Sequence, residues 1–316
     1  MQISGQTGAD VFKTGIDLGG TKTEVIVLAP DDAVLFRKRV ATPRKQGYSA
    51  ILQCIVQLIS EAGEVIPPRS RHSIGIGIPG SIHAETGLVQ NANTTCLIGK
   101  PFQKDIEQHL GCGISIENDA NCFIFAECRA GAARGYGFVF GVIMGTGCGG
   151  GMCIDGHIRK GLNNIAGEWG HYAVDPQGAL CYCGNRGCVE TKISGAGVEA
   201  DFTARYSRMI SMQSIVQGFR NGDHECLDAC SRFFDDFGRC LGGLISVLDP
   251  DAVVLGGGLS NINELYTIGV ECIGKYAFHN NLKTPILKNQ LGDSAGVYGA
   301  AWIGAEALHS SSPARH

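Results

Sequence analysis

The stretch VFKTGIDLGGTKTEVIVLA, Val11–Ala29, decides the fold, because it holds two apolar β-forming runs joined by a Gly-Gly turn. Ala33–Val40 supplies a third strand of the same kind. Further along the chain, Phe138–Met144, a glycine turn and Gly149–Ile154 repeat the order of strand, turn and strand. A hairpin unit that occurs twice predicts two related α/β lobes.

Composition excludes several classes of protein. The chain has 316 residues, of which 44% are hydrophobic and 18% charged, with 46 Gly and 10 Pro, so it is not disordered, collagen-like or a coiled coil. The formal net charge is -4, and no run of Lys or Arg resembles a stripe that follows nucleic-acid phosphates, so no nucleic-acid partner is expected. Since no apolar run approaches the roughly 18 to 20 residues that cross a bilayer, no membrane association is expected either.

The cysteines and the N-terminal residues indicate a compartment. The 14 cysteines are spread through a long, glycine-rich chain instead of a short disulfide scaffold. The first residues, MQISGQTGADVFKTG, lack the basic segment followed by an apolar stretch that directs secretion. We therefore expect a reducing, cytoplasmic location.

The helical periods and strands suggest where the lobes divide. Helices are expected at Tyr48–Ala62, Phe102–Leu110, Ala120–Ala130, Leu227–Leu248 and Ser260–Tyr276. We expect a small N-terminal lobe over residues 1–120, completed by a C-terminal helix at about 295–310. A large lobe with a metal-binding loop is expected over residues 121–294.

Three glycine turns each follow an apolar strand. They are Asp17-Leu18-Gly19-Gly20-Thr21-Lys22, the run from Met144 to Gly151 that holds Gly145-Thr146-Gly147, and the run from Leu255 to Ser260 that holds Gly256-Gly257-Gly258. None has the spacing of a Walker loop. Each alone could be a tight turn, but three such turns together favour a nucleotide site, because exposed backbone N–H groups can face phosphates.

The segment Glu117-Asn118-Asp119-Ala120-Asn121 lies where a strand meets a helix. Phosphorylation of a hydroxyl needs a carboxylate that accepts its proton, and Asp119 is suited to that task. The alternative is that Asp119 caps the helix that follows. Residue type and position leave both interpretations open.

His171, Cys181, Cys183 and Cys188 follow the pattern His-x9-Cys-x-Cys-x4-Cys. This is a Cys₃His set suited to tetrahedral zinc, and Gly184 and Gly187 would let the loop bend around the ion. The alternatives are a redox pair at Cys181 and Cys183, or free thiols packed as small apolar groups. Because four protein ligands would fill the coordination sphere, the zinc would be structural.

Five motifs, in this order, resemble the ROK family of sugar kinases and repressors: DLGGTK, ENDAN, GTGCGGG, GEWGHYAVDPQGALCYCGNRGCVE and VVLGGGLSN. The resemblance covers about residues 14–304 and implies the actin-like, hexokinase-type ATPase fold, with two α/β lobes and a cleft between them. It also implies ATP and Mg²⁺ in that cleft and the same zinc spacing.

The resemblance assigns roles to residues. It makes Asp119 the base and Asp17 the carboxylate on the Mg²⁺ or phosphate side. The residues expected to contact the sugar are Gly80, Asn118, Asp119, Glu168, His171 and Glu190. The residues expected at ATP are Asp17, Gly19, Gly20, Thr21, Lys22, Gly145, Thr146, Gly147, Gly256, Gly257 and Gly258.

The family also contains sugar-responsive repressors with an N-terminal DNA-binding domain. About 14 residues precede the first glycine-loop strand here, so we expect an enzyme and not such a repressor. A sugar-responsive regulator without a DNA-binding domain is the alternative of a different class. The stretch Asn91–Thr95 looks most like the fructokinase and manno(fructo)kinase branch, which would form fructose 6-phosphate. N-acetylglucosamine, followed by glucose, is the alternative substrate, and a homodimer is expected.

Overall fold

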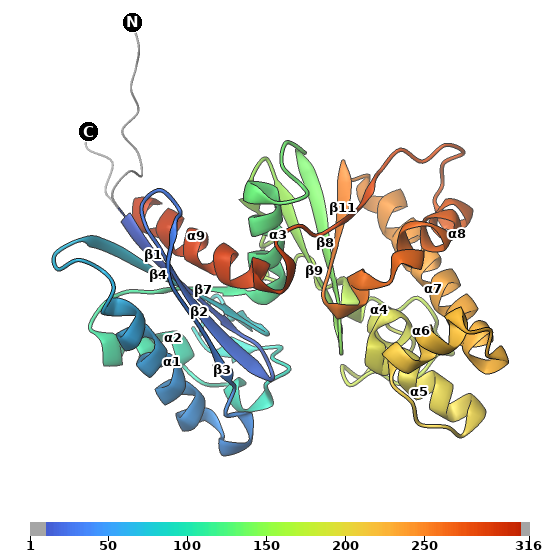
Figure 1. Cartoon of the computed structure of the whole chain (residues 1–316), viewed down its shortest axis with the longest axis horizontal. Coiled ribbons are helices and arrows are strands. Elements are labelled where there is room, and N and C mark those ends of the chain that lie inside the picture. Colours follow the sequence, from blue (N-terminus) through green and yellow to red (C-terminus); the bar gives the residue numbers. More distant parts are fainter. Residues whose placement is uncertain (1–10, 311–316) are drawn as a thin grey trace, which may run out of the picture. The chain divides into compact units, whose positions relative to one another are not determined.

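The computed structural model describes residues 11–310, and Figure 1 labels most of its helices and strands. The chain divides into two compact units. Unit 1 comprises Met1–Ala126, Gly161–Ile165 and Ser294–His316, and unit 2 comprises Glu127–Lys160 and Ala166–Asp293. The backbone therefore passes between the units several times, first after Ala126 and last after Asp293.

Unit 1 is built on a five-stranded sheet in the order β3-β2-β1-β4-β7. Its strands are β1 (Val11–Leu18), β2 (Lys22–Leu28), β3 (Val34–Ala41), β4 (Arg71–Ile78) and β7 (Ser115–Asn118). The strands β1, β2 and β3 are antiparallel neighbours, whereas β4 runs parallel to both β1 and β7. A small hairpin of β5 (Ser81–Ile82) and β6 (Val89–Gln90) follows β4.

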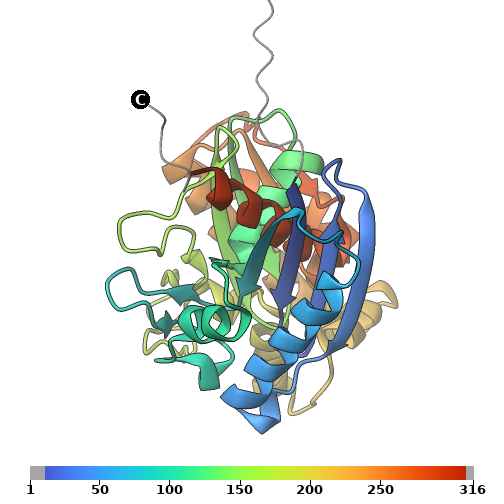
Figure 2. The same cartoon turned by 90° about the vertical axis from the view of Figure 1, so that its left-hand side faces the viewer.

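Helices cover both faces of this sheet. The helices of unit 1 are α1 (Tyr48–Gly63), α2 (Phe102–Leu110), most of α3 (Asp119–Ala130) and α9 (Ala295–Ser310). Figure 2 shows α1 and α2 in front of the sheet and α9 behind it. Buried Ile51 and Ile55 of α1 pack with Ile16 of β1. The opposite face carries Gly15 and Gly75, where a Cβ would lie 2.2 and 1.8 Å from backbone oxygens of α9, so glycine allows this helix to pack directly on the strands.

Unit 2 has a second five-stranded sheet in the order β10-β9-β8-β11-β12. Its strands are β8 (Phe138–Met144), β9 (Cys148–Ile154), β10 (His157–Ile158), β11 (Ala252–Gly256) and β12 (Ile286–Lys288). Its helices are α4 (Val189–Ile193), α5 (Gly195–Tyr206), α6 (Met212–Arg220), α7 (His224–Leu248) and α8 (Ile268–Tyr276). Phe233, Phe234 and Phe237 of α7 are buried in its core.

Both predicted hairpins are present, and the α/β fold class is confirmed. The expected helix Ser260–Tyr276 is wrong, because this segment forms two short 3-10 turns before α8 begins at Ile268. Ser260 is drawn into the turn, where its hydroxyl donates to the Gly257 carbonyl and its own carbonyl accepts from the Tyr266 hydroxyl. Between residues 11 and 310, none of the helices combines the length and apolar character needed to cross a membrane.

Candidate active site

Asp119 is the first residue of α3, directly after β7. The helix is capped mainly by Asn118, whose Oδ1 accepts from the N–H groups of Ala120 at 2.9 Å and Asn121 at 3.3 Å. Asp119 Oδ1 also accepts from the Ala120 N–H group, at 2.8 Å. The capping role that was the alternative for Asp119 is therefore carried largely by Asn118.

Asn118 also holds Gly80 in place. Its Nδ2 donates to the Gly80 carbonyl at 3.1 Å. Gly80 has φ of +150°, and a Cβ there would lie 2.8 Å from the Gln90 carbonyl and 2.9 Å from the Ala92 Cα atom. Glycine is required at residue 80 because the segment 90–92 lies against it. Through the bond from Asn118, the residues Asn118, Asp119 and Gly80 form one small cluster in unit 1.

Asp17 is brought to the same cluster by β1. Burial, followed by the nearby carboxylates of Asp119 and Glu24, raises the pKa of Asp17 to about 7, against an opposing effect of Arg39. Glu24 is the residue opposite Asp17 in the β1–β2 pairing. A divalent cation at these oxygens would relieve the repulsion between them, so the cluster fits the Mg²⁺ that the family resemblance implies.

Glu24 belongs to a polar network that sequence reasoning missed. Its carboxylate is buried and accepts from Arg37 and Arg39 of β3, and the Ser294 hydroxyl bonds the same carboxylate. The signal was present, because Glu24 interrupts an apolar strand and two arginines alternate on the next one. Since Ser294 directly precedes α9, this network ties that helix to the hairpin that carries Asp17.

The first glycine turn is tight at Gly19 and open at Gly20. The Gly19 N–H group donates to the Lys22 carbonyl at 2.9 Å, and a Cβ on Gly19 would lie 2.8 Å from that oxygen. A Cβ on Gly20 would meet nothing closer than 4.0 Å. The turn itself accounts for Gly19, whereas Gly20, Thr21 and Lys22 are available to a ligand.

The second and third glycine turns lie together in unit 2. Gly257 has φ of +75°, and a Cβ there would lie 2.3 Å from the Met144 carbonyl, directly before Gly145. The backbone N–H of Gly195, at the start of α5, donates to the Gly145 carbonyl at 2.8 Å. Beside them is a cavity of about 1210 Å³, whose lining includes Thr146 and Glu190.

The glycines of β9, and Gly170 opposite them, are required for packing within unit 2. A Cβ on Gly150 would lie 2.6 Å from the Trp169 ring, and one on Gly170 would lie 2.0 Å from the Cys148 carbonyl. Trp169 Nε1 also donates to the Gly149 carbonyl at 3.1 Å. The close approach that these glycines permit is that of the segment 167–170, which carries Glu168, and not that of a ligand.

Three polar residues expected at the sugar come together in unit 2. Burial and the nearby Glu190 carboxylate raise the pKa of Glu168, whereas His171 lowers it. Glu190, at the start of α4, accepts from the Cys148 N–H group at 2.9 Å, which fixes its carboxylate against β9. Carboxylate acceptors of this kind suit a ligand rich in hydroxyl groups.

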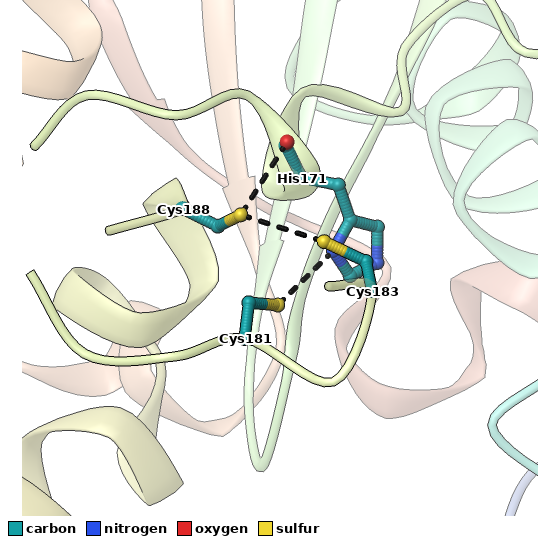
Figure 3. A group of neighbouring side chains, drawn as sticks. All are labelled: His171, Cys181, Cys183 and Cys188. Atoms are coloured by element: carbon teal, nitrogen blue, oxygen red, sulfur yellow. Dashed lines mark hydrogen bonds between the residues drawn. The ribbon is translucent and has the colours of Figure 1, made fainter. Parts of the chain in front are cut away.

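The predicted metal ligands gather into one cluster, shown in Figure 3. One ligand atom from each of His171, Cys181, Cys183 and Cys188 lies within 4.8 Å of all the others. The Cys183 and Cys188 sulfurs are 3.6 Å apart, and Cys181 Sγ lies 3.5 Å from His171 Nδ1. Zn–S bonds of about 2.3 Å give a tetrahedral edge of about 3.8 Å, so the donor set and its spacing fit zinc.

The second nitrogen of His171 contacts Tyr182, a residue that the sequence analysis did not assign to the site. Its Nε2 lies 2.9 Å from the Tyr182 hydroxyl, and the two rings pack edge to face. We expected this nitrogen to face a sugar. Tyr182 stands between two expected ligands, Cys181 and Cys183, so its closeness to His171 could have been foreseen.

Comparison with known proteins shows the family of this chain. Residues 13–307 match the ROK family. The chain belongs to the ROK family. It is 37% identical to an N-acetyl-D-glucosamine kinase of Pectobacterium atrosepticum, over 92% of this chain and 97% of that protein.

Two solved ROK structures share the fold. A ROK hexokinase from Thermus thermophilus superposes with a TM-score of 0.84 and 28% identity, covering 95% of this chain and 99% of its own. A ROK family glucokinase from Streptomyces griseus, in complex with glucose and AMPPNP, has a TM-score of 0.79 and 28% identity, covering 93% and 99%. At this similarity over nearly full lengths, the broad prediction of a ROK sugar kinase is supported.

Proposed function

We propose that this chain is an ATP-dependent N-acetylglucosamine kinase, which transfers the γ-phosphate of ATP to a hydroxyl group of the sugar. The observation that carries the choice of sugar is the name of the Pectobacterium relative, which matches over 97% of its own length. Fructose, our first expectation, becomes the second candidate. Its remaining support is the stretch Asn91–Thr95.

In this proposal Asp119 accepts the proton of the attacking hydroxyl, and the hydroxyl oxygen forms its bond to the γ-phosphorus as the bond to ADP breaks. Asn118 and Gly80 position that carboxylate and contact the sugar. When bound, Mg²⁺ would neutralise charge on the phosphates, and Asp17 is the residue that would hold it. Burial first, and the carboxylates of Asp119 and Glu24 second, raise the pKa of Asp17, and a bound cation would offset both effects.

For ATP we propose all three glycine turns. The residues are Gly19, Gly20, Thr21 and Lys22 in unit 1, and Gly145, Thr146, Gly147, Gly256, Gly257 and Gly258 in unit 2. The AMPPNP complex of the Streptomyces glucokinase supports a nucleotide partner for this fold. The open space beside Gly20 and Gly145 supports a close approach of phosphate to these backbones.

We propose a structural zinc ion at His171, Cys181, Cys183 and Cys188. Zinc there would stiffen the loop between Glu168 and Glu190, the two carboxylates that we assign to the sugar together with His171. Contact between His171 and the sugar would require the Tyr182 hydroxyl to move aside or to relay the hydrogen bond. The cytoplasmic location and the homodimer stay predictions.

A coupled ADP-release assay tests the proposal with N-acetylglucosamine, fructose, mannose, glucose and N-acetylmannosamine. We expect kcat/KM for N-acetylglucosamine to exceed that for fructose by more than about tenfold, because a site that bonds the acetamido group discriminates against sugars that lack it. The reverse order would restore the fructokinase assignment. Absence of ADP release with all five sugars, in zinc-replete protein, would contradict a hexose kinase.

A further inference from the structure

Glu127 is a buried carboxylate that the proposed mechanism does not use. It lies on α3, eight residues after Asp119, and none of its surface is exposed. Its Oε2 accepts from the Ala132 N–H group at 2.8 Å, and its Oε1 accepts from the Leu291 N–H group at 2.9 Å. The Gln290 N–H group lies 3.2 and 3.1 Å from the two oxygens. Three backbone donors from two distant segments therefore share one carboxylate.

These segments lie in unit 2, a few residues from the first and last places where the chain passes between the units. Unit 2 begins at Glu127, and it ends at Asp293, three residues before Gly296. Gly131 shows how closely the first segment wraps the carboxylate, since a Cβ there would lie 2.1 Å from Glu127 Oε2. The carboxylate thus joins the end of α3 to the segment that leads into α9.

The same two helices are also in contact within unit 1. A Cβ on Gly299 of α9 would lie 1.9 Å from the carbonyl oxygen of Cys122, on α3. On α9, Gly296 packs against Asp17, because a Cβ there would lie 2.9 Å from its Oδ2. Helix α3 therefore begins with Asp119, and α9 begins beside Asp17. The two helices are joined by Gly299 and Cys122 within unit 1, and α3 is joined to the segment before α9 by Glu127 within unit 2.

From this geometry we propose that Glu127 is a positioning residue for phosphoryl transfer. Its carboxylate holds the end of α3 and the entry to α9 as one element, and so keeps Asp119 and Asp17 in register. This role rests on the proposed kinase function. It differs from a purely structural role because it acts on the placement of reacting groups, where an error of about 1 Å costs up to about a hundredfold in rate.

The test uses Glu127→Gln in the full chain. An amide has one acceptor oxygen, and its NH₂ group would face backbone donors, so at least one bond is lost. The matched control is Glu199→Gln, since Glu199 also accepts a backbone N–H bond, from Met212 at 2.7 Å, but lies away from both crossings. Gly131→Ala is a second variant, which crowds the carboxylate and leaves Glu127 itself unchanged.

Amide hydrogen exchange of peptides that contain Gln290 and Leu291 reports the join directly. We expect faster exchange there in Glu127→Gln and Gly131→Ala than in Glu199→Gln. In steady-state kinetics, we expect the first two variants to have a kcat about tenfold or more below that of Glu199→Gln, while KM for sugar changes by less than about threefold. Unchanged exchange, or faster exchange with an unchanged kcat, would overturn the positioning role. If wild-type protein phosphorylates no sugar, the proposed function fails, while the exchange data still decide whether the carboxylate joins the two segments.

Discussion

Units 1 and 2 each contain a five-stranded sheet of corresponding topology, and they place different side chains at the equivalent position of that sheet. In both, an antiparallel hairpin is followed by two parallel strands, in the orders β3-β2-β1-β4-β7 and β10-β9-β8-β11-β12. The second-to-last residue of the first strand is Asp17 in unit 1 and Ile143 in unit 2. Its cross-strand partner is Glu24 in the first case and Gly149 in the second.

This difference shows how one scaffold can serve two tasks. In unit 1 the position supplies a carboxylate next to Asp119, which suits proton and cation chemistry. In unit 2 the equivalent positions are apolar or glycine, and the strand instead accepts the close approach of Trp169 and the segment that carries Glu168. We therefore expect loss of Asp119 or Asp17 to impair the chemical step, and changes in the segment 168–190 of unit 2 to impair binding.

The largest effect is expected from Asp119→Asn. The variant keeps shape and the Ala120 contact but cannot accept the hydroxyl proton, so kcat should fall by about a thousandfold or more while sugar affinity changes little. Steady-state kinetics and sugar titration by calorimetry measure the two quantities. Glu199→Gln, outside the cluster, should stay close to wild type. A kcat of Asp119→Asn within about tenfold of the wild-type kcat would contradict the assignment of the chemical step to the unit 1 carboxylates.

Zinc removal should act on binding. We expect Cys183→Ser, or chelation, to lose the metal and to weaken sugar binding by about 10- to 100-fold, because the loop that carries Glu168, His171 and Glu190 loses its support. Elemental analysis and calorimetry check both parts. Cys112→Ser, at an exposed cysteine of unit 1, should retain zinc and full affinity. Unchelated wild-type protein with far less than about one zinc per chain would contradict the assignment.

Much of the fold was predictable because its signals are local. The two hairpins follow from apolar runs around glycine, and the metal cluster follows from four ligands within 18 residues. The break of Ser260–Tyr276 into short turns was not predictable, since it depends on bonds from Ser260 and Tyr266 to the turn around Gly257. Helix α5 was missed because Gly195 and Gly197 stand in its first turn.

The candidate site was predictable by residue type and less so by contact. Asn118 was expected to bind sugar, yet its side chain also caps α3 and holds Gly80. The sequence carries signals for Tyr182 and Glu24, but the bonds from Ser294 to Glu24 and from Leu291 to Glu127 join residues distant in sequence. Spacing along one chain does not encode such pairings, whereas it does encode a turn or a metal loop.

The smallest effect is expected on KM for ATP. The variants Gly20→Ala and Gly145→Ala test it, one in the hairpin of each unit. Within the protein a Cβ has room at both positions, and neither residue has a positive φ, so the thermal midpoint should stay near that of the wild-type protein. If phosphate oxygens approach these backbones, the added methyl group should raise KM for ATP by about tenfold and leave KM for sugar within about twofold. An increase confined to Gly145→Ala would assign the phosphates to unit 2 alone. No increase in either variant would remove both turns from the nucleotide site and leave Gly256–Gly258 as its remaining candidate.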